Sequence, residues 1–228
     1  MGNDAMILGI DEIRFTYPRA KKMRVYAVGI AADNTGKVLV TEPPSSALIR
    51  HRPKIGRPAV WDFGGDGYMI YQKTGGLADI IAAHLLIVRD RSASRRAGDI
   101  VKAVSHSDAA RESIKLASQS LSGITVGGLA TASALGVVLP IAGLVGDIIK
   151  KKKDKVLQTI SGSLFLDQER KQADELSETI GSPDGNMEIV VDAFLFDAGI
   201  DEDSVADTKG AETRLQADGL LFTSDEIN

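Results

Sequence analysis

The sequence predicts an α+β fold, an antiparallel β-sandwich with a Gly/Ala-rich helical insertion. Short runs of β-branched and aromatic residues, separated by turn-forming residues, occupy both ends of the chain. Between them, residues 93–150 follow a helical pattern, and much of this block is Gly and Ala. We therefore expect one β-rich domain over residues 1–196 that contains the insertion, followed by an acidic C-terminal tail over residues 197–228.

The N-terminal part of the chain carries the clearest strand signals. Residues 6–17 end in apolar–polar alternation, which is typical of a half-buried strand. Residues 23–32 and 37–41 are rich in β-forming residues and flank a four-residue turn at 33–36, which predicts a hairpin. Residues 47–51, between prolines, suit either a short edge strand or an ordered loop.

Two more strands and a second hairpin are predicted before the insertion. Residues 59–63 and 68–72 flank a glycine-rich turn at 64–67, and this arrangement predicts that the two runs pair with each other. Residues 79–88 contain the apolar run IIAAHLLIV, whose length suits a buried strand or a short helix. A strand is favoured because glycines precede this run and β-branched residues bracket it.

The insertion begins with two amphipathic helical segments, and Ser107 with Asp108 can cap the second. After the insertion, residues 155–166 and 187–196 predict strands. The polar segment at 167–180 between them is expected to be helical.

The most unusual feature of the sequence is its uncharged stretch, residues 116–146, which four consecutive lysines follow closely. Its length is sufficient to span a bilayer, its small residues are spaced for close helix contact, and the lysines suit a membrane anchor. Against a membrane span, the stretch is rich in small residues, Pro140 interrupts it and it contains no aromatic residue. The residues that define it are Gly123, Gly127, Gly128, Gly136, Pro140, Gly143, Gly146, Lys150, Lys151, Lys152 and Lys153.

Three interpretations of this stretch remain open on sequence alone. We favour a buried helical hairpin that breaks near Gly136 or Pro140 and covers the sheet, since Gly and Ala allow helix and sheet to approach closely. Conditional insertion of residues 122–149 into a membrane is the second interpretation. A permanent transmembrane helix is the third.

Charge and composition limit the function classes. Residues 1–117 hold 18 Lys and Arg against 12 Asp and Glu, whereas residues 156–228 hold 4 against 17. Nucleic-acid binding is disfavoured, because the total charge is −4 and no basic patch is interleaved with aromatic residues. The absence of cysteine excludes disulfides, and the N-terminus lacks the pattern of a signal peptide. We expect a cytoplasmic location, or export without a classical signal peptide.

Calcium is the one cofactor that the sequence suggests. Asp33 lies in a predicted turn, and Asp197, Asp201 and Asp203 follow the last predicted strand. Carboxylates clustered at strand ends are the ligands that calcium prefers. These four residues are the candidate metal ligands.

The layout of short strands with acidic loops, and the segment KKKDKVLQTISGSLFLD at 151–167 in particular, resembles C2 domains. In that family a charged loop precedes a strand of this kind. The resemblance implies a module that binds membranes or protein partners, often through calcium. The helical insertion departs from the family's pattern.

These observations favour a non-enzymatic interaction or assembly module. No catalytic motif is present, so no catalytic residue is assigned, and an enzyme of unrecognised type stays open as a further hypothesis. The expected partner is another protein or a second copy of the chain, which would contact the Gly-rich helical block. The alternative is a membrane-active, toxin-like protein that inserts residues 122–149.

Overall fold

The structure is a computed structural model of the chain. It describes residues 4–16, 22–50, 58–64, 67–91, 96–121, 129–167, 169–172, 175–182 and 184–196. The predicted acidic tail, which includes Asp197, Asp201 and Asp203, lies outside these residues, as do Gly123, Gly127 and Gly128.

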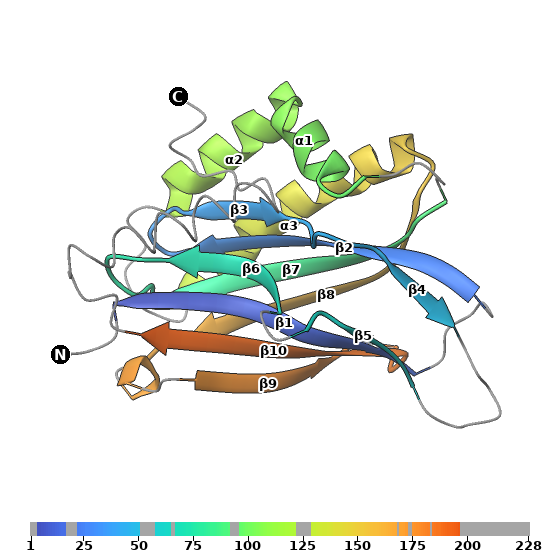
Figure 1. Cartoon of the computed structure of the whole chain (residues 1–228). Helices are drawn as coiled ribbons and strands as arrows, with labels where there is room; N and C mark the ends of the chain where they lie inside the picture. Colours follow the sequence, from blue (N-terminus) through green and yellow to red (C-terminus); the bar gives the residue numbers. More distant parts are fainter. Residues whose placement is uncertain are drawn as a thin grey trace, which may run out of the picture.

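The described residues form three layers, with two antiparallel sheets face to face and helices on the outside of one sheet (Figure 1). The α+β prediction with two antiparallel sheets is therefore confirmed. The first sheet, called sheet A, contains β1 (Ala5–Phe15), β5 (Ala59–Asp62), β6 (Tyr68–Lys73), β9 (Glu175–Gly181) and β10 (Met187–Phe196). The second, sheet B, contains β2 (Lys22–Asp33), β3 (Val38–Thr41), β4 (Ala47–Arg50), β7 (Ile80–Arg89) and β8 (Lys155–Phe165).

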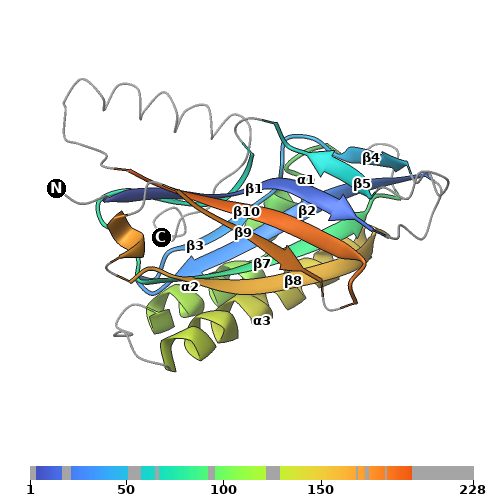
Figure 2. The same cartoon turned by 90° about the horizontal axis from the view of Figure 1, so that it is seen from below.

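The helices lie between β7 and β8 in the sequence and cover the outer face of sheet B (Figure 2). They are α1 (Asp99–Ser105), α2 (Asp108–Leu121) and α3 (Leu129–Lys151). All three helices begin within the range 93–150 that was predicted for the insertion. As predicted, α2 begins beside Ser107, whose Oγ accepts a hydrogen bond from the Ala110 N–H at 3.4 Å. The carboxylate of Glu42, which directly follows β3, accepts hydrogen bonds from the first turn of α1, at 2.9 Å from the Ile100 N–H.

Two hydrophobic cores follow from this layering. The inner faces of both sheets form one core, with Phe15, Tyr71 and Ile87 among its fully buried side chains. The outer face of sheet B and the helices form the other. Strands β2 and β7 are therefore buried on both faces, which explains why residues 79–88 show no alternation in the sequence.

The predicted second hairpin is wrong. β5 and β6 do not pair with each other, because both pair with β1: β5 along 12–15 and β6 along 6–10. The 11-residue β1 is long enough to hold both partners end to end. The glycine-rich segment between them is thus an interruption of one edge of sheet A rather than a reversal of the chain.

The predicted helix at 167–180 is also wrong for most of its length. The structure has only a short 3-10 helix, η2 (Arg170–Gln172), and then the edge strand β9. Leu176 and Ile180 both pack against the core between the sheets. Their spacing of four residues fits one face of a helix and one face of a strand equally well, and pairing with β10 decides for the strand.

A buried tyrosine connects the two sheets at mid-strand. The Tyr68 hydroxyl of sheet A accepts a hydrogen bond from the Gly29 N–H of sheet B at 2.8 Å and donates one to the Thr41 carbonyl at 2.8 Å. Burial raises the pKa of Tyr68, so its hydroxyl stays protonated and keeps both roles. The close approach requires glycine at position 29. A Cβ there would lie 2.8 Å from Ile70 Cγ2 and 2.9 Å from the Tyr68 hydroxyl.

We predict that Gly29→Ala lowers the free energy of unfolding by about 1–3 kcal/mol, the usual cost of overpacking a core. Urea unfolding measures this loss. Gly9→Ala is the matched control, because a Cβ on Gly9 would meet only the Tyr68 carbonyl oxygen at 3.8 Å. Equal unfolding midpoints for the two variants would contradict the prediction.

Candidate functional site

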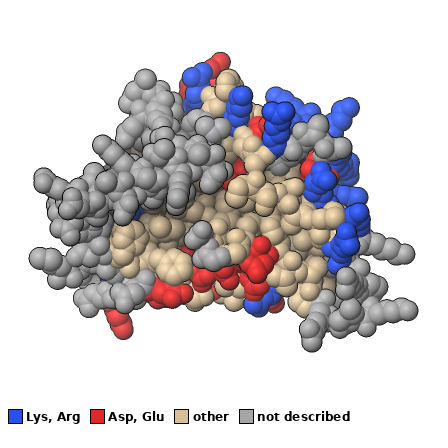
Figure 3. Space-filling view, viewed as in Figure 1, with Lys and Arg blue, Asp and Glu red and all other residues tan. Residues whose placement is uncertain are grey.

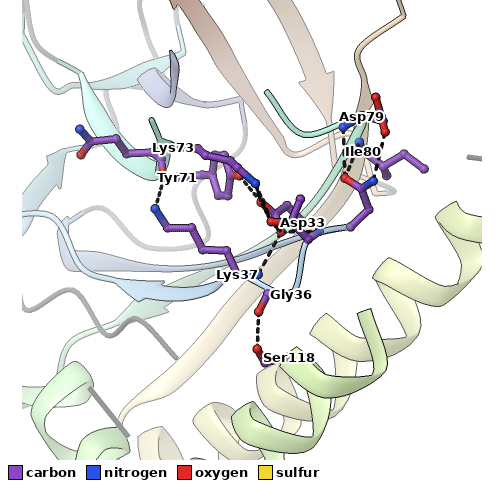
Figure 4. A network of polar contacts seen from close by, with 11 residues as sticks. Asp33, Gly36, Lys37, Tyr71, Lys73, Asp79, Ile80 and Ser118 are labelled. Carbon is purple, nitrogen blue, oxygen red and sulfur yellow. Dashed lines mark hydrogen bonds and ion pairs between the residues drawn. The ribbon is translucent and has the colours of Figure 1, made fainter. Parts of the chain in front are cut away.

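Asp33, the calcium candidate within the described residues, is a buried carboxylate surrounded by hydrogen-bond donors (Figure 4). Its oxygens accept hydrogen bonds from the Tyr71 hydroxyl at 2.6 Å and from the Lys73 ammonium at 3.0 Å. The Thr35 and Lys37 backbone N–H groups donate to Oδ1 at 2.8 and 2.9 Å. Asp33 therefore holds the β2–β3 turn on sheet B and binds it to β6 of sheet A.

The protonation states in this network follow from its geometry. Burial by itself raises the pKa of Asp33, but the hydrogen bonds from Tyr71 and Lys73 lower it by more, so the carboxyl stays ionised. Burial and the adjacent negative charge raise the pKa of Tyr71, which therefore remains a donor. The cluster is a paired and satisfied ionic network.

This network leaves little room for a cation at Asp33, because an ammonium group already neutralises its charge. Within the described ranges, no group of three or more His, Cys, Asp or Glu could hold a metal ion. The calcium assignment to Asp197, Asp201 and Asp203 stays a prediction, since these residues lie outside those ranges.

Helix α3 contains the second half of the uncharged stretch and runs through Gly136 and Pro140 without a break. The predicted break at either residue is therefore wrong. Pro140 cannot donate a hydrogen bond to the Gly136 carbonyl, but both residues are exposed, so water can satisfy that carbonyl. One stripe of α3 is buried on sheet B and comprises Val138, Ile141, Ala142, Val145 and Ile149.

The opposite side of α3 is an exposed apolar surface. Leu139 is 49% exposed there, and Gly136, Pro140 and Gly143 are exposed beside it. A Cβ placed on either of these glycines would meet nothing within 4 Å. Packing within the chain therefore does not require glycine at these positions. We call these four residues the outer face of α3.

The lysines after α3 belong to a larger basic surface. At the end of sheet B where β2 begins, Lys22 lies opposite Arg50 of β4 in the strand register. Arg89 of β7 lies between β2 and Lys155 of β8. In Figure 3 these cations appear as a blue cluster at the right, over the ends of β2, β4 and α3 that Figure 1 labels. We call this surface the basic end: Lys22, Arg24, Arg50, Arg89, Arg91, Lys150, Lys151, Lys152, Lys153 and Lys155.

A buried carboxylate holds the loops of the basic end in place. Asp154 is 6% exposed and accepts hydrogen bonds from the Tyr26 hydroxyl at 3.0 Å and the Arg91 N–H at 2.9 Å. The preceding residue, Lys153, has a φ of 65° and is the one non-glycine residue with positive φ in the described chain. Glycine is the usual residue at such a helix end, and a side chain there costs about 1 kcal/mol. The position thus carries a charge at a cost in stability.

Sheet A presents the opposite charge. Asp11 lies near Asp192, Asp62 and Glu12, and partial burial together with repulsion from these neighbours raises the pKa of Asp11. Acidic side chains gather along the lower part of Figure 3, which corresponds to sheet A in Figure 1. The molecule therefore has a basic end on sheet B and α3 and an acidic surface on sheet A.

A cavity of about 280 Å³ lies between the inner faces of the two sheets. Apolar side chains from β1, β6, β7, β8, β9 and β10 line it. Most of its half-exposed lining residues lie on β8 and β9, the edge strands of the two sheets, so the cavity opens between these edges. Arg170, Ser177 and Glu178 are exposed at this opening. A void of this volume, if enclosed and empty, would cost on the order of 7 kcal/mol.

Two of these features escaped the sequence analysis. The basic end combines cations from β2, β4, β7 and β8 with the lysine run, and the sequence signal for it was only the excess of Lys and Arg before residue 118. For the cavity, the sequence offered no signal other than small residues within predicted strands.

Comparison with protein-family models, with curated proteins and with solved structures finds no match to this chain. Among the helices in the described part of the chain, none combines the length and the apolar character needed to cross a membrane.

We predict that Asp33→Asn lowers the free energy of unfolding by about 3 kcal/mol at pH 7, because it leaves the Lys73 charge without its partner. Since the pKa of Asp33 is lowered on folding, its contribution is present above the unfolded-state value near 3.8 and is lost as the pH falls below it. The difference between variant and wild type should therefore shrink between pH 5 and pH 2.5 in urea unfolding experiments.

Asp79→Asn is the control for this prediction. Asp79 also accepts a hydrogen bond from a lysine, Lys171, at 2.5 Å, and this bond lowers the pKa of Asp79. Its side chain is 36% exposed, so the substitution should cost under about 1 kcal/mol. A constant difference between Asp33→Asn and wild type at every pH would contradict the assignment.

Proposed function

We propose that the chain is a non-enzymatic interaction module that docks on an anionic phospholipid surface through its basic end. The observation that carries the proposal is the convergence of ten Lys and Arg residues from four strands, α3 and the residues directly after β7 and α3 on one end of the molecule. A lysine near an anionic membrane contributes about 1 kcal/mol of attraction, so a cluster of this size is enough for stable docking.

Three further features support a lipid surface as the partner. Leu48, paired with Arg24 at the basic end, is 45% exposed and can enter the headgroup region. Lys153 keeps its charge in a backbone conformation that favours glycine. The acidic surface of sheet A is repelled by anionic lipid, so the charge separation orients the molecule with its basic end toward the membrane.

Docking in this manner does not require α3 to leave the fold. Moving α3 into a bilayer would expose the buried stripe from Val138 to Ile149 and the facing residues of sheet B, and each large apolar side chain so exposed costs about 1.5–3 kcal/mol. Insertion of residues 122–149 remains the alternative proposal. The C2-like resemblance agrees with peripheral docking, since two antiparallel sheets with charged loops at one end are what that resemblance implies.

The proposal predicts that the protein sediments with vesicles containing phosphatidylserine and not with vesicles of phosphatidylcholine alone. The paired substitution Lys151→Glu with Lys155→Glu should lower the partition constant at least about 30-fold, since each lysine contributes about 1 kcal/mol. Raising the salt concentration should weaken the wild-type binding.

The charge-matched control is Arg111→Glu with Lys115→Glu, two exposed residues of α2 away from the basic end. This variant should bind vesicles as the wild type does. Equal loss in both double variants, or no binding by the wild type, refutes the proposal. Release of a trapped dye would favour insertion over docking. Millimolar calcium in the same assay tests Asp197, Asp201 and Asp203.

A second proposal, self-association through the outer face of α3, rests on a separate observation. Gly136 and Gly143 sit in the interior of an exposed helix surface, where glycine costs about 1 kcal/mol relative to alanine. Among the described residues, no contact requires either glycine. Small residues on a helix surface let a second backbone approach closely, and Leu139 supplies an apolar anchor between them.

We predict that Gly136→Ala and Gly143→Ala each raise the free energy of unfolding by about 0.5–1 kcal/mol and weaken self-association. Urea unfolding and sedimentation velocity at several protein concentrations measure the two effects. Leu116→Ala, which removes a 60% exposed leucine from α2, is the control and should leave association unchanged. A wild type that is monomeric up to high micromolar concentration would exclude this second proposal.

A further inference from the structure

The cavity between the sheets results from small residues that lie in register. Ala83 of β7 pairs with Gly162 of β8, so two neighbouring positions on the inner face of sheet B lack a large side chain. Ala193 of β10 lines the cavity from sheet A. Stacked sheets lie about 10 Å apart and normally fill that distance with interdigitating side chains. Here the small residues leave the space unfilled.

The size and lining of the cavity specify an apolar occupant. Its volume of about 280 Å³ holds about nine groups the size of a water molecule, each of which takes roughly 30 Å³. The inner walls are branched aliphatic side chains such as Leu8, Ile70 and Leu85. Unfilled space with apolar walls binds apolar molecules. One alkyl chain of eight to ten carbons matches this volume.

The opening of the cavity adds a cation in a fixed position. Arg170 lies in η2, whose neighbouring Lys171 is bound to Asp79 at 2.5 Å. The Arg170 N–H donates to Asp167 Oδ1 at 2.8 Å, and its Nη1 donates to the Phe165 carbonyl at 3.3 Å. The remaining donors of its guanidinium group can bind a carboxylate. Glu178, on the same opening, repels an anionic head group and repels one with two negative charges more strongly, so the carboxylate is expected on the Arg170 side of the opening.

We propose that this cavity binds a medium-chain carboxylic acid, with the alkyl chain between the sheets and the carboxylate at the opening beside Arg170. The site is separate from the basic end, because its opening lies between the edge strands β8 and β9. Binding here is independent of the docking that the basic end performs.

Isothermal titration with decanoate, below the concentration at which it forms micelles, tests the proposal on the full-length protein. We expect saturable binding with one molecule per chain. Ala83→Ile and Ala193→Ile fill the cavity from opposite sheets, so each should abolish binding, and circular dichroism identifies a variant that does not fold. Two variants on different strands keep the test decisive if one of them is unfolded.

Arg170→Met tests the position of the head group. It should lower decanoate affinity about fivefold, the scale set by a solvent-exposed ion pair, and leave the affinity for decanol unchanged. Arg111→Met, on the exposed side of α2, is the matched control and should change neither affinity. The proposal is overturned if the wild type shows no saturable decanoate binding, or if folded cavity-filling variants bind as the wild type does. Equal decanoate affinity in Arg170→Met and wild type overturns the assignment of the carboxylate.

Discussion

The ionised carboxylate of Asp33 is where the three layers of this protein meet. It holds the β2–β3 turn of sheet B and accepts hydrogen bonds from Tyr71 and Lys73 of sheet A. The same turn accepts a hydrogen bond from Ser118 of α2 through the Gly36 carbonyl, at 2.5 Å (Figure 4). A buried charge is stable only when it is paired and fully hydrogen-bonded, so the relative position of sheet A, sheet B and α2 is constrained at this one point.

The basic end lies at the other end of β2. Lys22 and Asp33 are the first and last of the 12 residues of β2, and they lie about 36 Å apart along the strand. The hydrogen-bond network of Asp33 fixes the layers at one end of β2. The opposite end can therefore carry exposed charge without a large penalty in stability. There, buried Asp154 positions the loops, while the cations around it remain in water. The contacts that stabilise the layers and the proposed docking surface therefore lie at opposite ends of sheet B.

The space between the two sheets is closely packed in one region and unfilled in another. Tyr68 brings the sheets together at Gly29, where no side chain fits. Toward the β8 and β9 edges the space stays unfilled and forms the cavity, because the residues there are small: Ala83, Gly162 and Ala193. Both regions depend on small residues, but with opposite results. At Gly29 a hydroxyl from the facing sheet occupies the space, whereas at Gly162 the nearest facing atom is 3.6 Å from the position of a Cβ and belongs to Ile180.

The sequence by itself determined which segments form strands and where the helical insertion begins, because alternation, turn residues and helix caps are local signals. It predicted the β2–β3 hairpin and the strand at β7, and a strand was one of its two interpretations of the segment that forms β4. It failed where the decision depended on a distant partner. β5 and β6 pair with β1 rather than with each other, β9 is a strand because β10 is available, and α3 continues through Pro140 because that side faces water.

The candidate sites divide in the same way. The lysine run is visible in the sequence, but only the tertiary structure joins it to the cations of β2, β4 and β7 and places Ala83, Gly162 and Ala193 around one cavity. These groupings join residues that are far apart in the chain, and strand pairing and layer packing bring them together.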